Sequence, residues 1–123
     1  MSLAPISLMT EPKPVDLVHL AQYTGGDVRL NAELLEMFVQ QCGTVVERLQ
    51  SLLDTPDTRL WAESAHSLKG AAAGIGAFDV AESAGCAEAI DPATKGESAA
   101  DCVALLRKRC DLVKSFVDSY LKR

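Results

Sequence analysis

Residues 61–75, with the sequence WAESAHSLKGAAAGI, decide the fold class of this chain. Apolar residues recur there in steps of four and three, the spacing that gathers side chains on one face of an α-helix. This stripe consists of Trp61, Ala65, Leu68, Ala72 and Ile75. His66 and Lys69 lie off the stripe and three residues apart, so we expect them to be neighbours on the exposed side. The stretch therefore predicts an amphipathic helix with one buried face.

Two further helices are predicted before this stretch. A short helix is expected over residues 15–24, with Leu17 and Leu20 facing inward, and it stops at the two glycines of residues 25–26. Asp27 then provides an N-cap for a long helix that ends near residue 54. Its inward stripe is expected to contain Leu30, Leu34, Phe38, Cys42, Val45, Leu49 and either Leu52 or Leu53.

Local sequence also predicts where the three remaining helices begin. Thr55 as N-cap and Pro56 as first helical residue predict the start of the helix that carries His66. An alanine-rich helix is expected over residues 78–90, and Ser98 with Asp101 has the spacing of a capping box for the last helix. The inward residues of that last helix are expected to be Cys102 or Val103, Leu105, Leu106, Cys110, Val113, Phe116, Val117 and Leu121.

These segments predict an all-α fold, an antiparallel up-down four-helix bundle with an additional short N-terminal helix. The sequence has no alternating β pattern of useful length, and short connections make consecutive long helices antiparallel neighbours. The first helix is too short to span the bundle and is expected to cover one end. Residues 1–14 carry three prolines and few periodic apolar positions, so we expect a flexible leader there and one domain over residues 15–123.

Charge and hydropathy exclude several classes of function. The net charge of −5 argues against nucleic acid as a partner, since binding to phosphates needs clustered lysines and arginines. The one basic cluster, Arg107 to Arg109, is interpreted as a solvated helix face. No apolar run approaches the roughly 20 residues that span a bilayer, and the N-terminus does not resemble a signal peptide. We therefore expect a cytoplasmic protein without a membrane partner.

The cysteines give no indication of a metal site. Cys42, Cys86, Cys102 and Cys110 form no C-x-x-C pair and have no histidine at ligand spacing. All four fall in helical patterns, so they are interpreted as small buried residues without disulfide bonds.

His66 is the candidate nucleophile. Its neutral imidazole is available near neutral pH, but attack on an acyl group would also need a triad-like partner and an oxyanion hole, which the sequence does not offer. Phosphoryl transfer depends mostly on positioning and on neutralisation of the oxygen charges. Lys69 supplies part of that neutralisation, and Gly70, one turn beyond His66, leaves clearance for a partner.

The chain offers no means of using ATP itself. It contains no glycine-rich phosphate loop ending in Lys-Ser or Lys-Thr, and its acidic residues are not clustered as Mg²⁺ ligands would be. We therefore expect no cofactor of its own and no kinase activity. The phosphoryl group has to come from another protein.

Residues 65–77, AHSLKGAAAGIGA, resemble the signature of histidine-containing phosphotransfer (HPt) domains of two-component phosphorelays. The resemblance implies that His66 is phosphorylated on Nε2 by a receiver-domain aspartyl phosphate and passes the group to another receiver. It also implies that Lys69 stabilises the phosphoryl oxygens, that Gly70 leaves room for the receiver, and that a glutamine lies against the imidazole. Gln40 and Gln41 both qualify; counted from Phe38, Gln41 lies one helical step nearer the core.

The resemblance also implies the partners. These are response-regulator receiver domains and a hybrid sensor histidine kinase, and the receiver supplies Mg²⁺. Docking is expected on a mainly apolar patch around His66, for which Val39, Ala62 and Ala73 are candidates. The motif needs only a monomer.

Two other functions remain open. One is a helical-bundle interaction module whose His66 is not phosphorylated. The other is a metal-binding bundle, which would need several inward Glu-x-x-His pairs, whereas Glu63 and His66 form one such pair on the exposed side. His19 is interpreted as a structural or merely exposed residue.

Overall fold

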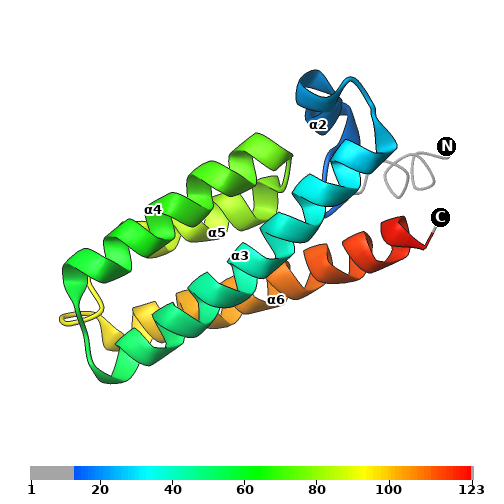
Figure 1. The fold of residues 1–123 in the computed structure, drawn as a ribbon. Coiled ribbons are helices and arrows are strands. Elements are labelled where there is room, and N and C mark those ends of the chain that lie inside the picture. Colours follow the sequence, from blue (N-terminus) through cyan, green and yellow to red (C-terminus); the bar gives the residue numbers. More distant parts are fainter. Residues whose placement is uncertain (1–12, 123) are drawn as a thin grey trace, which may run out of the picture.

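The computed structural model describes residues 13–122, and every regular element among them is an α-helix. The helices are α2 (Leu17–Thr24), α3 (Val28–Asp54), α4 (Thr58–Ile75), α5 (Phe78–Glu88) and α6 (Gly96–Leu121). Helix α4 packs against α3 and α5, and α6 packs against the same two helices (Figure 1). Helix α2 lies at the end of the bundle where α3 begins and contacts α3 and α4. The all-helical class is confirmed for these residues, whereas most of the predicted leader, residues 1–12, lies outside them.

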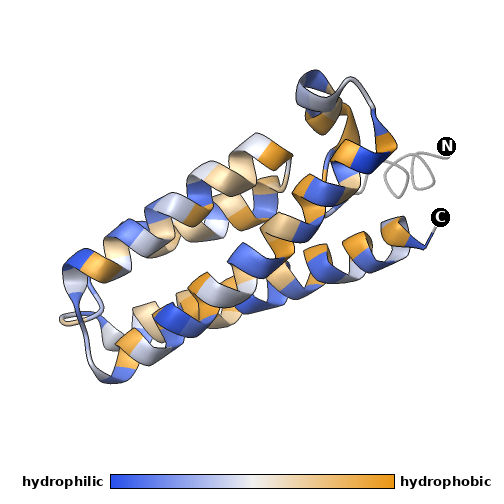
Figure 2. Cartoon of the chain, viewed as in Figure 1, coloured by the Kyte–Doolittle hydropathy of each residue, from blue (hydrophilic) through white to orange (hydrophobic). Residues whose placement is uncertain are grey.

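The core is formed by one apolar stripe from each long helix. All five residues predicted for the stripe of α4 are buried. Figure 2 shows α4 and α5 paler than the strongly apolar positions of α3, because alanine, glycine and serine fill much of their surface. The buried set also contains Leu35 of α3, which the sequence prediction omitted. Within residues 13–122 no helix combines the length and hydropathy needed to cross a membrane.

Three leucines that were predicted to lie in the core are exposed. Leu30 is 39% exposed because it lies in the first turn of α3, where the inward position belongs to Asn31. In α6 the buried stripe keeps steps of three and four throughout, which places Leu105 and Leu121 on the neighbouring exposed face. That stripe consists of Ala99, Val103, Leu106, Cys110, Val113, Val117 and Tyr120.

Aspartates begin three of the helices. The carboxylates of Asp16, Asp27 and Asp57 each accept the backbone N–H three residues on, at 3.0 Å. The predicted start at Thr55 and Pro56 is therefore wrong: Thr55 closes α3, and α4 begins two residues later, because Asp57 supplies the better acceptor.

The predicted capping box of α6 is also wrong. Helix α6 begins at Gly96, so Ser98 already lies inside it, and Lys95 at the N-cap makes no side-chain capping bond. A tight turn in which Lys95 N–H donates to the Asp91 carbonyl at 2.9 Å leads the chain into this helix. The turn, rather than a capping side chain, sets the start of the helix.

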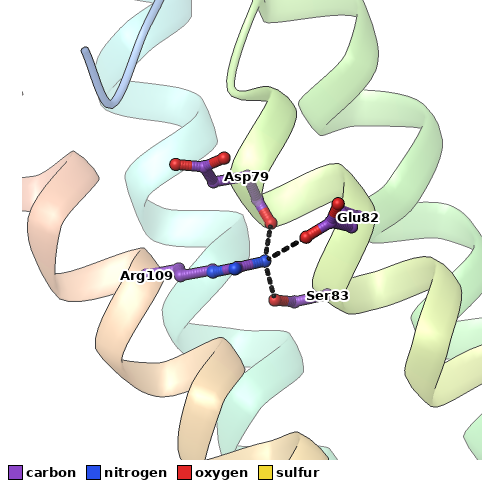
Figure 3. A network of polar contacts seen from close by, with 4 residues as sticks. All are labelled: Asp79, Glu82, Ser83 and Arg109. Atoms are coloured by element: carbon purple, nitrogen blue, oxygen red, sulfur yellow. Dashed lines mark hydrogen bonds and ion pairs between the residues drawn. The ribbon is translucent and has the colours of Figure 1, made fainter. Parts of the chain in front are cut away.

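Helix α5 is short and rich in alanine, and side chains of its neighbours hold it in place. The Arg109 guanidinium donates to the Asp79 carbonyl, Glu82 Oε1 and Ser83 Oγ at 3.0, 2.9 and 2.8 Å (Figure 3). Arg109 therefore does not belong to a solvated basic face, although Arg107 and Lys108 are exposed. At the other end of α5, the buried indole N–H of Trp61 in α4 donates a hydrogen bond to the Ala87 carbonyl at 2.7 Å.

Helix α2 is attached through backbone and buried polar groups. Asp16 N–H donates to the Gly76 carbonyl at 2.9 Å. At the other end of α2, the Thr24 hydroxyl donates to Asn31 Oδ1 at 2.6 Å, and Asn31 Nδ2 donates to the Tyr120 hydroxyl at 3.2 Å. Since these three side chains are buried, their hydrogen bonds join α2 to α3 and to the end of α6.

The four cysteines are free, and they differ in burial. Cys42 and Cys110 are buried between α3 and α6, and Cys102 is half-buried. The contact with Cys110, followed by burial, raises the pKa of the Cys42 thiol, which therefore stays protonated. Cys86 is exposed on α5, so its predicted burial is wrong: the inward positions of this helix belong to Ala84 and Ala87.

Candidate functional site

The candidate site lies on the exposed face of α4. His66 and Lys69 point away from the core, with 72% and 51% of their side chains exposed. The neighbouring Ala65 and Leu68 are fully buried, so the helix is fixed while its outer face stays open. An ideal Cβ at Gly70 would meet no atom within 4 Å, which leaves the surface beyond the imidazole clear.

A carboxylate from another helix completes the site. Glu88 at the end of α5 places Oε2 2.8 Å from His66 Nδ1 and Oε1 3.8 Å from Lys69 Nζ. The first distance is that of a charge-assisted hydrogen bond, and the second is that of a looser ion pair. One nitrogen of the imidazole is therefore engaged by protein, while no protein group among residues 13–122 hydrogen-bonds to the other, Nε2.

No sequence motif in α4 indicates a role for Glu88. It lies 22 residues beyond His66, so helical spacing within α4 could not reveal the contact. The available indication was its position directly after Ala87, at the edge of the buried stripe of an alanine-rich helix. A half-buried carboxylate at such a position usually has a polar partner on the neighbouring helix.

The stem of Lys69 lies across α5 at Gly85. An ideal Cβ at Gly85 would be 3.6 Å from Lys69 Cδ and 3.7 Å from Cε, which is ordinary van der Waals contact. Gly85 and Glu88 lie three residues apart and thus on one face of α5. This face forms the second wall of the site, opposite the exposed side of α4.

The two candidate glutamines differ in position. Gln41 of α3 is half-buried and donates a long hydrogen bond, 3.4 Å, to the hydroxyl of Ser67, next to His66 in α4. Gln40 is exposed. Within residues 13–122 neither glutamine hydrogen-bonds to the imidazole, so Gln41 reaches the neighbourhood of the site through Ser67.

An apolar groove of about 700 Å³ adjoins the site between α2, α3 and α4. His66, Gly70 and Gly74 occupy successive turns of α4, and Gly74 lines the groove. Tyr23 and Met37 form part of its wall and are each 65% exposed. Exposed apolar side chains around a concave surface mark a place where a partner can bind.

Of the three residues predicted for the docking patch, two lie on α4 outside its buried stripe. Ala73 is exposed and Ala62 is half-buried on α4. Val39 instead lines a small cavity of about 120 Å³ between α3 and α6, together with Cys110, so its assignment to the patch is wrong. Position 39 faces α6 because Phe38 and Cys42 carry the buried stripe of α3.

His19, and Glu63 of the Glu-x-x-His pair, contact other side chains of the protein in the manner of structural residues. Glu63 Oε2 is 3.0 Å from Arg59 Nε, within one face of α4. No group of three or more His, Cys, Asp or Glu side chains that could hold a metal ion occurs in the described part of the chain. His19 packs edge-on against the rings of Tyr23 and Phe78, with centroid distances of 5.7 and 5.0 Å.

Comparison with known proteins shows the family of this chain. The model of the Hpt domain family matches residues 33–116, which is more than half of the chain and contains α4 and α5 entire. The match also contains Gln41, His66, Lys69 and Glu88, whereas α2 lies outside it. No curated protein and no solved structure matches the chain. The chain belongs to the Hpt domain family, which supports a phosphotransfer role in two-component signalling.

Proposed function

We propose that His66 accepts a phosphoryl group on Nε2 from the aspartyl phosphate of a receiver domain and relays it to a second receiver. The observation that carries this proposal is the exposed imidazole whose Nδ1 lies 2.8 Å from Glu88. With Nδ1 engaged, the second ring nitrogen is the one available for attack.

The transfer requires one bond to form and one to break. The lone pair of Nε2 attacks phosphorus in line with the P–O bond to the aspartate, and the aspartate carboxylate leaves with the electrons of that bond. The proton on Nδ1 stays in place, so the phosphorylated ring carries a positive charge next to Glu88. Lys69 offsets the negative charge of the phosphoryl oxygens, and the receiver supplies Mg²⁺.

The receiver docks, in this proposal, over His66 and the apolar groove beside it. On the exposed face of α4 beyond His66, Gly70, Ala73 and Gly74 have no large side chain, so a partner backbone can approach the imidazole closely. The exposed rim residues Tyr23 and Met37 provide apolar area at the groove. Docking of this kind needs one copy of the chain, and a hybrid sensor histidine kinase is the expected upstream partner.

An antiparallel up-down order of α3 to α6 is also part of the proposal. It is supported by the connections between α3 and α4 (residues 55–57) and between α4 and α5 (residues 76–77), which are too short for a crossover along the bundle. In Figure 1 the chain colours progress in opposite directions along α3 and α4.

The test is transfer from a receiver charged with a small-molecule phosphodonor in the presence of Mg²⁺, followed by intact-mass analysis. We expect a gain of one phosphoryl group that is labile in acid and is lost in His66→Gln. Since this side chain is largely exposed, His66→Gln should change the free energy of unfolding by no more than about 0.5 kcal/mol. No gain from any of a panel of receivers, with the protein folded, would favour an interaction module without phosphorylation.

A further inference from the structure

We infer that Cys42 of α3 and Cys110 of α6 form a redox site, at which hydrogen peroxide converts the two thiols into a disulfide that links the two helices. The inference goes beyond the proposed function, because neither thiol takes part in phosphoryl transfer. Both cysteines are free in the structure, and their exposed fractions are 3% and 8%. The site can therefore be tested without a receiver domain.

The packing of α3 on α6 brings the two cysteines together. A hydrogen bond of 3.2 Å from Asn31 Nδ2 to the Tyr120 hydroxyl fixes how the two helices are aligned. Cys42 follows Asn31 by about three helical turns, and Cys110 precedes Tyr120 by about three turns. Both cysteines line the same cavity between the helices, with a volume of about 120 Å³. The two sulfurs are thus neighbours that share one empty space.

This cavity gives a small molecule access to the thiols. Its rim contains Gly43 and Glu47 of α3 and Asp111 and Lys114 of α6, and all four are exposed. An ideal Cβ at Gly43 would meet no atom within 4 Å, so no side chain covers the cavity there. A water molecule needs about 15 Å³ of such space. A hydrogen peroxide molecule, with two oxygen atoms, can therefore enter.

The two thiols differ in which of them ionises. The hydrogen bond between them raises the pKa of Cys42 and lowers the pKa of Cys110. Burial and Asp111 act against the lowering at Cys110, and Arg107 supports it. Cys42 thus keeps its proton, and the thiolate forms at Cys110. The thiolate is the form that reacts with peroxides, and a second cysteine beside it can resolve the product into a disulfide.

The oxidation proceeds in two balanced steps. The Cys110 thiolate attacks one oxygen of hydrogen peroxide, the O–O bond breaks, hydroxide leaves, and Cys110 becomes a sulfenic acid. The Cys42 sulfur then attacks the Cys110 sulfur, the S–O bond breaks, and the leaving hydroxide departs as water with the Cys42 proton. Two thiols and one peroxide give one disulfide and two waters, so the sulfurs lose the two electrons that the peroxide oxygens gain. Because α3 also forms a wall of the apolar groove, the disulfide fixes that wall against α6.

The experiment uses the native chain, because trypsin places each cysteine in a different peptide. Cys42 falls in residues 30–48, Cys86 in 70–95, Cys102 in 96–107 and Cys110 in 110–114. Folded protein is treated with hydrogen peroxide, the peroxide is removed with catalase, and the remaining thiols are alkylated in urea before digestion and mass spectrometry. We expect peptides 30–48 and 110–114 to appear as a linked pair, two hydrogens lighter than their sum. Dithiothreitol should abolish the pair, and the intact oxidised protein should keep the mass of a single chain.

Exposed Cys86 reports whether the peroxide dose was sufficient. If Cys86 is oxidised while Cys42 and Cys110 both remain alkylated thiols, the inference is overturned. Sulfinic acid at Cys110 beside an unreacted Cys42 would overturn it as well, as would a link that joins two chains.

A pair of glycine variants tests the route through the cavity. Gly43→Leu places a side chain at the cavity rim, whereas Gly96→Leu makes the same change at another helical position with open surroundings, outside this cavity. Circular dichroism checks that both variants are folded. When half of the native protein is linked, Gly43→Leu should show a clear loss of the linked pair, and Gly96→Leu should match native protein. Equal rates of linkage in all three proteins would show that the peroxide does not reach the thiols through this cavity, which contradicts the proposed site.

Discussion

Gly76, which ends α4, is the position at which a single added methyl group should lower the free energy of unfolding most. Its φ is +90°, in the left-handed region, where a residue with a Cβ costs about 1–2 kcal/mol. An ideal Cβ would also lie 2.7 Å from the Asp16 carbonyl oxygen, so the backbone before α2 has to move. That movement breaks the 2.9 Å bond from Asp16 N–H to the Gly76 carbonyl, worth about 0.5–1.5 kcal/mol net. Gly76→Ala should therefore lower the free energy of unfolding by about 2–3 kcal/mol.

Gly74→Ala provides the matched control two residues earlier. Gly74 lies inside α4, and a Cβ there would meet nothing within 4 Å, so the helix should gain up to about 1 kcal/mol. Urea unfolding followed by circular dichroism at 222 nm should move the midpoints of the two variants in opposite directions. In thermal unfolding Gly76→Ala should lose about 8–12 °C, at about 4 °C per kcal/mol for a chain of this size. A neutral or stabilising Gly76→Ala would refute the reasoning about the α2 attachment.

Three other substitutions test the site and its support. Lys69→Ala should slow transfer from a charged receiver by about 10- to 100-fold without abolishing it, since one charge-assisted contact is lost; unchanged rates would remove its electrostatic role. Gly70→Leu should impair transfer while its unfolding midpoint stays equal or rises by the equivalent of up to about 1 kcal/mol, because the site for its Cβ is open. Unimpaired transfer by this variant would contradict the clearance argument. Trp61→Phe should lower the free energy of unfolding by about 2–4 kcal/mol in urea, because the Ala87 carbonyl loses its buried donor; a loss below about 1 kcal/mol would contradict that account.

The helices could be predicted from the sequence because their buried faces are periodic. Trp61, Ala65 and Leu68 were assigned to the core by spacing alone, and they are fully buried. The error at Leu30 occurs because a neighbouring element, rather than helical period, decides burial there. Leu30 lies near the end of the bundle, and the polar Asn31 takes the inward place because Thr24 and Tyr120 provide hydrogen-bond partners. No pattern within α3 contains that information.

The site residues also fall into two groups, those that helical spacing predicts and one that depends on how two helices pack. His66, Lys69 and Gly70 belong to one helix, so their common exposed face follows from their spacing. Glu88 comes from another helix, and its contact with His66 depends on how α5 packs on α4. Gly70 and Gly74 lie inside α4, whereas Gly76 lies outside it as the C-cap. Spacing could not separate a glycine that weakens a helix from one that ends it.

The unequal burial of the four thiols has a practical consequence for spectroscopy. Cys86 is the exposed one among them, so a maleimide dye or spin label should attach there first. Cys42 and Cys110 are shielded in the core, and burial raises the pKa of the half-buried Cys102, which slows its alkylation. Gly85 and Glu88 mark the face of α5 turned toward Lys69 and His66, and Cys86 lies off that face. A single reporter could thus be placed on the native sequence to follow receiver association by fluorescence without blocking the imidazole.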